Sequence, residues 1–394
     1  MDTQLSQRVQ RIKPSPTLMM TARAAALKAA GRDIIGLGAG EPDFDTPEHI
    51  KSAAIQAIQN GFTKYTAVDG TPSLKRAIVN KFSRENDLTY KTDQIIVSVG
   101  GKQSFFNLAQ ALLNPGDEVI IPAPYWVSYP DMVLLADGIP VIVPATIDNH
   151  FKITPEQLAA AITPRTRLFV INSPSNPTGV SYNSAELAAL GAVLRHFPQV
   201  LIASDDMYEH IRWDSTPFRN ILNICPDLYE RTIVLNGVSK TYAMTGWRIG
   251  YCAAPAPLVA AMVNIQSQST SNPTSIAQVA AQAAIEGGLE CIKPMLDAFH
   301  ARHNFVVATL NQIRGVHCLP SDGTFYVFPD VRTAITTLPG VDDDIVLSEY
   351  LLEHAGVAVV PGSAFGAPGY IRLSFATSMT NLQTALARIA AVFN

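Results

Sequence analysis

Short apolar runs alternate with amphipathic stretches along residues 46–290. The amphipathic stretches place apolar residues at helical spacing, and the apolar runs have the length of buried strands. We predict helices over residues 48–59, 71–85, 103–113 and 184–195, and strands over residues 94–99, 118–121, 140–143, 167–172, 200–204, 232–235 and 247–253. This alternation predicts an α/β fold with a mostly parallel, helix-covered sheet.

The pattern changes after the glycine pair at residues 287–288. A long helical stretch around 298–313 precedes apolar strands at 325–328, 357–360 and 371–375, with a further helix between them. Such a mixture predicts a smaller α+β domain. Because no low-complexity linker separates the two parts, we expect them to pack closely and to close around a ligand.

Composition and charge narrow the classes of function. A chain of 394 residues with 47% hydrophobic residues is long enough for two domains. The net charge of -4 and the lack of a dense Lys/Arg run argue against a nucleic-acid partner. The polar residues 1–8 lack the apolar core of a secretory signal, and no apolar stretch is long enough to span a membrane. We therefore expect a cytoplasmic protein with no membrane partner.

The four cysteines lie far apart in the sequence, at Cys225, Cys252, Cys291 and Cys318. They form no C-x-x-C pair, so they indicate neither a zinc site nor a disulfide framework. We expect reduced, mostly buried thiols and no metal.

Polar residues follow three of the predicted strands. The turn at residues 172–179 follows one strand, an Asp-Asp-Met-Tyr segment at 205–208 follows another, and Gly100-Gly101 opens a predicted helix after a third. Strand ends of an α/β sheet commonly carry ligand-binding groups, and the first amides of a helix suit a phosphate. For the first two segments, an ordinary loop and a helix-capping aspartate would also explain the residues.

A fourth strand end carries the most informative segment, residues 239–250. The strand predicted at 232–235 ends at Asn236-Gly237, and Lys240 follows, eight residues before Arg248. A lysine can hold an aldehyde cofactor and an arginine its phosphate. Taken alone, Lys240 could equally be a solvated surface lysine.

Taken in order, these motifs resemble those of class I (fold type I) aminotransferases, which depend on pyridoxal phosphate (PLP). The bacterial-type aspartate aminotransferases are the most similar group. The resemblance covers nearly the whole chain and is carried by residues 38–44 (GAGEPDF), Tyr65, 124–130 (PYWVSYP), 172–179, 205–208, 239–250 and 370–374 (YIRLS). It implies a homodimer with active sites at the subunit interface. It also implies an N-terminal arm over 1–14, a small domain over 15–45 and 291–394, and a large PLP-binding domain over 46–290.

The resemblance assigns catalytic roles to Asp205, Tyr208 and Lys240. Asp205 would keep the cofactor's ring nitrogen protonated, because the ring accepts electrons only in that state. Asn176 and Tyr208 would hydrogen-bond the phenolic oxygen of the ring. Lys240 would hold the aldehyde and then, once displaced by the amino acid, move the Cα proton. The remaining residues that the resemblance assigns to the cofactor are Gly101, Lys102, Trp126, Ser239, Arg248 and, from the partner subunit, Tyr65.

The resemblance also assigns the substrate contacts. Arg372 would bind the α-carboxylate through two parallel hydrogen bonds, because a planar guanidinium matches a carboxylate; without the resemblance, a surface ion pair would explain the residue. The supporting residues are Gly40, Trp126 and Asn176. A second carboxylate would contact Lys102, Ser15 and Thr17, which favours dicarboxylic substrates.

The leading hypothesis is an aminotransferase that moves the amino group of aspartate to 2-oxoglutarate by a ping-pong mechanism. Prephenate could also serve as amino acceptor. An aromatic or glutamine-type aminotransferase, or a carbon–sulfur lyase, would have the same fold, although Lys102 and Thr17 argue against these enzymes. A non-enzymatic PLP-binding regulator would need a DNA-binding domain, and the residues before Pro14 leave no room for one.

Overall fold

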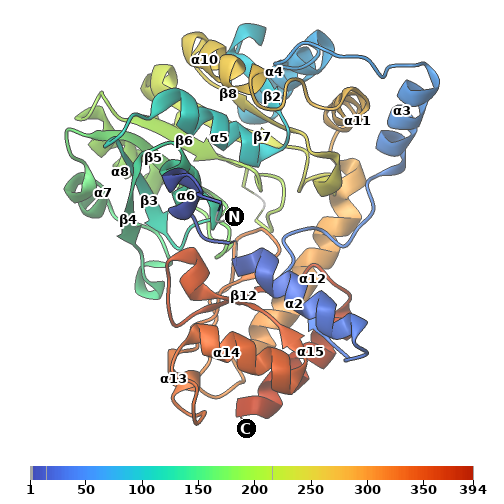
Figure 1. The fold of residues 1–394 in the computed structure, drawn as a ribbon, viewed down its shortest axis with the longest axis vertical. Coiled ribbons are helices and arrows are strands. Elements are labelled where there is room, and N and C mark those ends of the chain that lie inside the picture. Colours follow the sequence, from blue (N-terminus) through green and yellow to red (C-terminus); the bar gives the residue numbers. More distant parts are fainter. Residues whose placement is uncertain (1–2, 15, 215, 394) are drawn as a thin grey trace.

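A seven-stranded sheet forms the centre of the larger part of the computed structural model, which describes residues 3–14, 16–214 and 216–393 (Figure 1). Its strands are β2 (Ile95–Ser98), β3 (Glu118–Ala123), β4 (Ile139–Pro144), β5 (Thr166–Asn172), β6 (Leu201–Asp205), β7 (Thr232–Gly237) and β8 (Gly250–Ala253). They lie in the order β2-β8-β7-β6-β5-β3-β4. The predicted mostly parallel sheet is confirmed, with β8 antiparallel to both of its neighbours.

Helices cover both faces of this sheet because its strands are apolar on both sides. Alternate strand residues pack against α4 (Pro72–Asn86), α8 (Ser184–Arg195) and α11 (Ser275–Glu286) on one face. The residues between them pack against α5 (Gly101–Leu112), α6 (Ser128–Leu135) and α10 (Ala256–Ser267) on the other. Helix α3 (Glu48–Gln59) packs outside α11, and α7 (Pro155–Ala161) lies beside β4.

The strand predicted over residues 247–253 begins three residues late. Residues Thr245–Trp247 form a 3₁₀ turn, and Arg248 has a φ of 58°. A left-handed residue cannot continue a strand, so pairing starts only at Gly250. The prediction for residues 247–249 was therefore wrong.

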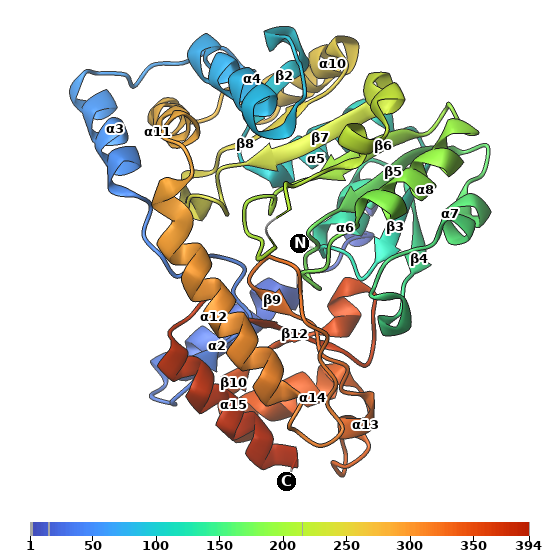
Figure 2. The ribbon, with the colours of Figure 1, turned by 180° about the vertical axis from the view of Figure 1, so that it is seen from behind.

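The described residues of the smaller part form two short sheets surrounded by helices. Strands β11 (Val360–Pro361), β12 (Ile371–Ser374) and β9 (Tyr326–Val327) form an antiparallel sheet, while β1 (Ile35–Gly36) pairs in parallel with β10 (Val357–Ala358). The helices are α2 (Pro16–Ala29), α12 (Lys293–Leu310), α13 (Arg332–Ile335), α14 (Asp344–Tyr350) and α15 (Met379–Phe393). Helix α12 runs from the large sheet into this part (Figure 2). The domain boundaries stay a prediction.

The parallel strands bring polar residues to one edge of the large sheet. Asn172, at the end of β5, is in register with Asp205, at the end of β6. Asp205 is in register with Leu235 of β7, which ends at Gly237, shortly before Lys240. The small antiparallel sheet lies beside this edge and carries Arg372 on β12. Across the described residues, no helix is both long and apolar enough to cross a membrane.

Candidate active site

A cavity of about 390 Å³ lies between this sheet edge and the smaller part. Among the described residues, every site residue predicted from the sequence lines it except Tyr65. The residues are Thr17, Gly40, Gly101, Lys102, Trp126, Asn176, Asp205, Tyr208, Ser239, Lys240, Arg248 and Arg372. Ser15 lies outside the described residues. Tyr65 does not line the cavity of its own chain: it follows α3 and is 92% exposed.

Asp205 lies at the floor of the cavity, at the carboxyl end of β6. The Tyr129 hydroxyl donates a hydrogen bond to its Oδ2, and the Met207 N–H donates to its Oδ1 over 3.2 Å. Burial raises the pKa of this carboxyl, although both hydrogen bonds and the charge of Lys240 oppose the rise. Asp205 is therefore a part-buried carboxyl that lines the cavity and is held by two donors of its own chain.

Lys240 lies in the loop after β7, with its amine inside the cavity. Its Nζ donates a hydrogen bond to the carbonyl of Gly40, over 2.5 Å. Burial, and then the positive charge of Arg372, lower the pKa of the amine from its ordinary 10.5 to about 8. About a tenth of Lys240 is thus neutral and nucleophilic at pH 7, and about half at pH 8.

The N-terminus of α5 and Arg248 form a cationic end of the cavity. Gly100 precedes the helix with a φ of 83°, and a Cβ at this position would lie 2.4 Å from Arg248 Nη2. Only glycine allows the guanidinium to approach the turn so closely. Within the described chain no side chain caps this helix, so its first amides, including that of Gly101, can receive an anion. Arg248 is held by the carbonyls of Thr245, at 2.9 Å, and Val99, at 3.4 Å.

Arg372 is 2% exposed and fixed on every side except the cavity. Its guanidinium donates to Asn176 Oδ1 over 2.9 Å and to the Gly38 carbonyl over 2.7 Å. The rings of Tyr326 and Phe365 lie 4.4 and 5.0 Å from the guanidinium carbon. Its Nε is buried and has no partner among the described residues. This arrangement holds a planar donor ready for a carboxylate.

Lys102 gives the cavity another cation. Its Nζ lies 5.4 Å from the centre of the Trp126 ring, a cation–π contact. Burial, and then the charge of Arg248, lower the pKa of Lys102. The hydroxyl of Thr17, from α2, also lines the cavity side and is buried without a partner in the part of the chain that the structure describes.

Seven residues of the cavity were not predicted as site residues: Val127, Ser128, Asn172, Met207, Leu235, Thr245 and Tyr326. The Tyr326 hydroxyl lies 3.1 Å from that of Tyr208, and its ring stacks on Arg372. Met207 Cε packs so closely on the turn that a Cβ on Gly101 would lie 2.6 Å away. Tyr326 lies in an apolar run of the sequence and looks like a core residue. The only signal for Met207 was its position between Asp205 and Tyr208.

Comparisons with known proteins agree with this geometry. Residues 32–389 match the family model described as aminotransferase class I and II. The aspartate/prephenate aminotransferase of Nitrosomonas europaea is 65% identical, over 99% of this chain and 100% of that protein. The crystal structure of the aspartate aminotransferase from Rhizobium meliloti has a TM-score of 0.96 at 49% identity, covering 99% of this chain and 98% of that one. The aspartate aminotransferase of Thermus thermophilus, solved with maleate, has a TM-score of 0.92 at 43% identity, with 99% and 100% coverage.

The resemblance noted in the sequence is thus confirmed over almost the full chain, and the hypothesis of a non-enzymatic regulator falls away. A part-buried lysine, a part-buried carboxyl and a cationic turn around one cavity match the cofactor on which this family depends. The chain is a member of the class I and II aminotransferases, PLP-dependent enzymes that move amino groups between amino acids and 2-oxo acids.

Proposed function

We propose that the enzyme transfers the amino group of aspartate to 2-oxoglutarate by a ping-pong mechanism. The main observation in its support is that two cationic side chains, Arg372 and Lys102, line the same cavity as the amine of Lys240. A dicarboxylic amino acid has two anionic groups and one reacting carbon between them, so it suits this arrangement.

The cavity residues fit PLP by their chemistry. Arg248, the first amides of α5 and the hydroxyl of Ser239 would hold the phosphate, and Trp126 would lie against the ring. Tyr208 and Asn176 would hydrogen-bond the phenolic oxygen. When bound, PLP supplies an electron sink that stabilises negative charge on the substrate Cα. Asp205 would hold the proton on the ring nitrogen, because this carboxyl lines the cavity and its oxygens can accept a further hydrogen bond.

Lys240 would move the proton at the substrate Cα. Its pKa of about 8 suits this role, because a base works best when its pKa lies near the operating pH. Its hydrogen bond to Gly40 holds the amine in place before reaction. The charge of Arg372 helps keep the amine neutral, so the residue that binds substrate also prepares the base.

Arg372 would bind the α-carboxylate of every substrate. Asn176 and Gly38 accept one N–H from each terminal nitrogen of the guanidinium, and the second N–H of each remains to pair with a carboxylate. Rigid support from Tyr326 and Phe365 fixes where this carboxylate sits. The Cα–H bond is thereby oriented before the proton moves.

Lys102 and Thr17 would bind the distal carboxylate, with Ser15 as a further predicted contact outside the described residues. Lys102 is a cation and Thr17 offers a buried hydroxyl without a partner among the described residues. The Thermus thermophilus relative was solved with maleate, which has two carboxylates. The Nitrosomonas europaea relative is named for prephenate as well as aspartate, and prephenate also has two carboxylates. We therefore propose prephenate as a second amino acceptor.

We also propose a homodimer in which Tyr65 contacts the cofactor phosphate of the partner subunit. Tyr65 is 92% exposed, and the preceding segment exposes Ile55, Ile58 and Phe62. Large apolar residues gathered on one segment are typical of a surface that a partner covers. The cytoplasmic location stays a prediction from the sequence.

Initial rates test the proposal. Purified enzyme loaded with PLP is assayed with 2-oxoglutarate against aspartate, alanine, phenylalanine and tyrosine, and with glutamate against oxaloacetate and prephenate. We expect aspartate to give the highest kcat/KM among the donors. A higher kcat/KM for phenylalanine or alanine than for aspartate would contradict the proposed substrate class.

A further inference from the structure

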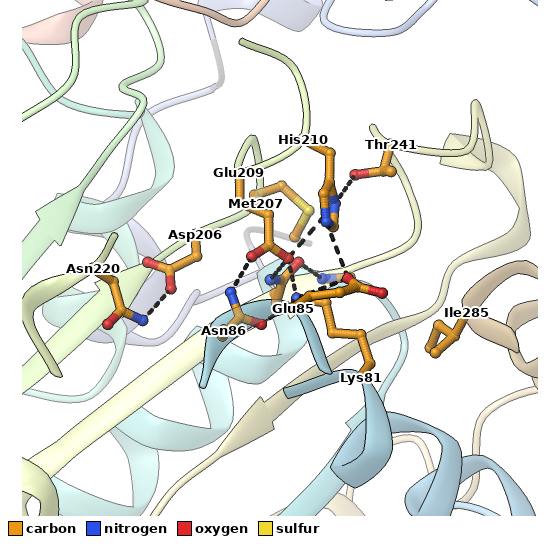
Figure 3. A network of polar contacts seen from close by, with 12 residues as sticks. Lys81, Glu85, Asn86, Asp206, Met207, Glu209, His210, Asn220, Thr241 and Ile285 are labelled. Atoms are coloured by element: carbon orange, nitrogen blue, oxygen red, sulfur yellow. Dashed lines mark hydrogen bonds and ion pairs between the residues drawn. The ribbon is translucent and has the colours of Figure 1, made fainter. Parts of the chain in front are cut away.

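A network of charged and amide side chains links α4 to the segment that follows β6 (Figure 3). It contains Lys81, Glu85 and Asn86 at the end of α4, and Glu209 and His210 after β6. The side chains of Lys81 and Glu209 are 3% and 2% exposed. The residues that line the cavity do not include these five. A buried charge is unfavourable unless it is paired, so this cluster calls for an explanation.

The Glu209 carboxylate is the centre of the cluster. It accepts hydrogen bonds from Lys81 Nζ, from Asn86 Nδ2 over 2.6 Å and from Asn236 Nδ2 over 2.7 Å. Burial alone would raise the pKa of Glu209, but the charges of Lys81 and His210 and the hydrogen bonds outweigh it and lower the pKa to about 2. Glu209 is therefore ionised at every pH at which the enzyme works.

The ligand set resembles a metal site, but a lysine supplies the cation. Oxygen and nitrogen atoms of Glu85, Glu209 and His210 lie within 4.8 Å of one another, as metal ligands do. The ammonium of Lys81 is ion-paired with Glu209, lies 3.8 Å from Glu85 Oε2 and donates to Asn86 Oδ1 over 2.7 Å. A positive charge is thus already at the position that a metal would take.

The cluster holds the immediate neighbours of two cavity residues. Glu209 follows Tyr208 in the chain, and Thr241 follows Lys240. His210 contacts Glu85 Oε2 at 3.1 Å through Nε2 and Thr241 Oγ1 at 3.4 Å through Nδ1. Asn236, which donates to Glu209, also accepts from the Gly237 amide over 2.7 Å at the end of β7. Helix α4 is therefore bonded to the loop of Tyr208, and that loop in turn contacts the end of β7 and the loop of Lys240.

We propose that the buried Lys81–Glu209 ion pair, with His210 and Thr241, positions the loops of Tyr208 and Lys240 for proton transfer. The inference rests on the proposed function, since it assigns the cluster to the reaction that Lys240 performs. Lys81 and Glu209 are positioning residues, because they act through Tyr208 and Lys240 and touch neither substrate nor cofactor. Their paired charges hold the two loops in place, which is the role that a structural metal has in other proteins.

Paired substitutions separate positioning from stability. Lys81→Met alone leaves Glu209 charged and unpaired, and we expect it to lower Tm by roughly 10 °C. In the double variant Lys81→Met/Glu209→Gln no buried charge is unpaired, so we expect most of the Tm to return. The kcat of this double variant should remain about tenfold below the wild-type value, because misplaced reacting groups slow the chemical step. Its KM should be nearly unchanged, because Arg372 still binds the substrate.

A second readout does not depend on catalysis. In the apoenzyme, amine-reactive labelling of Lys240, followed by mass spectrometry across pH, reports the fraction of neutral amine. We expect a midpoint near pH 8 in the wild type. In the double variant the midpoint should rise by about one pH unit, because a displaced loop admits water and relieves the desolvation of the amine. The matched control is Lys152→Met/Glu186→Gln, a partly buried pair between Lys152 and α8 outside the cavity, which should leave kcat and the midpoint unchanged.

A double variant with restored Tm, wild-type kcat and a wild-type labelling midpoint would show that the cluster only stabilises the fold. If the double variant fails to fold, two substitutions of Thr241 test the proposal instead. Thr241→Val removes the hydroxyl that contacts His210 and should lower kcat and shift the labelling midpoint, while Thr241→Ser keeps both at wild-type values. Equal behaviour of the two variants would overturn the proposal. Failure of the wild type to use aspartate would refute the proposed substrate instead, since the labelling needs no substrate.

Discussion

Arg372→Lys tests the geometry of the substrate site most directly, because it keeps the positive charge and removes the planar fork. In the wild type, Asn176 and Gly38 each accept one N–H from a terminal nitrogen of Arg372 and leave the second N–H of that nitrogen for a carboxylate. A lysine ammonium has no fixed fork, and the same two acceptors would compete for its hydrogens. We expect the substrate carboxylate to keep one charge-assisted hydrogen bond and lose the other.

The expected loss follows from the value of that bond. A hydrogen bond to a charged group contributes about 1.5–3 kcal/mol, so kcat/KM should fall roughly ten- to a hundredfold. Because Arg372 is almost fully buried, solvent screening reduces this figure little. Arg372→Met removes both bonds and should lower kcat/KM by about 10²- to 10⁴-fold.

The assay compares kcat/KM for aspartate, alanine and phenylalanine with 2-oxoglutarate as acceptor. All three donors share the α-carboxylate, so the loss should be similar for each. Thermal unfolding serves as the control for folding, since Tyr326 and Phe365 also pack on this side chain. A loss confined to aspartate would refute the reasoning, because it would place Arg372 at the distal carboxylate.

Three further predictions address the rest of the site. The rate at which apoenzyme takes up PLP should rise with pH and reach half its maximum near pH 8, because the lowered pKa makes Lys240 neutral above that pH. Stopped-flow absorbance measures this rate. A midpoint near 10.5 would contradict the burial of the amine. Lys102→Met should lower kcat/KM for aspartate by about three- to tenfold, a modest effect because this lysine is partly solvated, and should spare alanine; equal losses would assign Lys102 to the cofactor or the loop. Mixing two inactive proteins, Tyr65→Leu and Lys240→Ala, should give tagged heterodimers with one active site, and no activity in purified heterodimers would show that Tyr65 serves its own chain.

The functional residues near the strand ends could be predicted from the sequence, because each group of them lies within a short segment of the chain. Lys240, Asp205 and Arg372 each follow or occupy an apolar strand, and although each alone has an ordinary structural explanation, the ordered series of motifs that contain them is specific. Register then brings Asp205 and the loop of Lys240 together, because parallel strands end at one edge. The helices over 48–59 and 184–195 were predicted to the residue, since their apolar spacing is clear at both ends.

Features that depend on tertiary contacts escaped prediction. Tyr326 looks like a core aromatic in an apolar strand, and only its position under Arg372 shows its role. Lys81 and Glu85 are spaced like a solvated salt bridge on a helix, and only the fold shows that Lys81 is buried. The antiparallel direction of β8 also has no signal in an alternating pattern. A sequence pattern reports the secondary structure that a segment prefers, while these features depend on which distant segments pack against it in the fold.

The bond between Arg372 and the Gly38 carbonyl joins residues 334 positions apart in the chain. The lysine, the carboxyl and the cationic turn of the cavity all precede α12, whereas Arg372 lies near the end. A growing polypeptide therefore completes its cofactor half well before the arginine leaves the ribosome, and β1 must wait unpaired for β10 through most of synthesis. During that interval the nascent enzyme has the groups to capture PLP but lacks the arginine that selects amino acids.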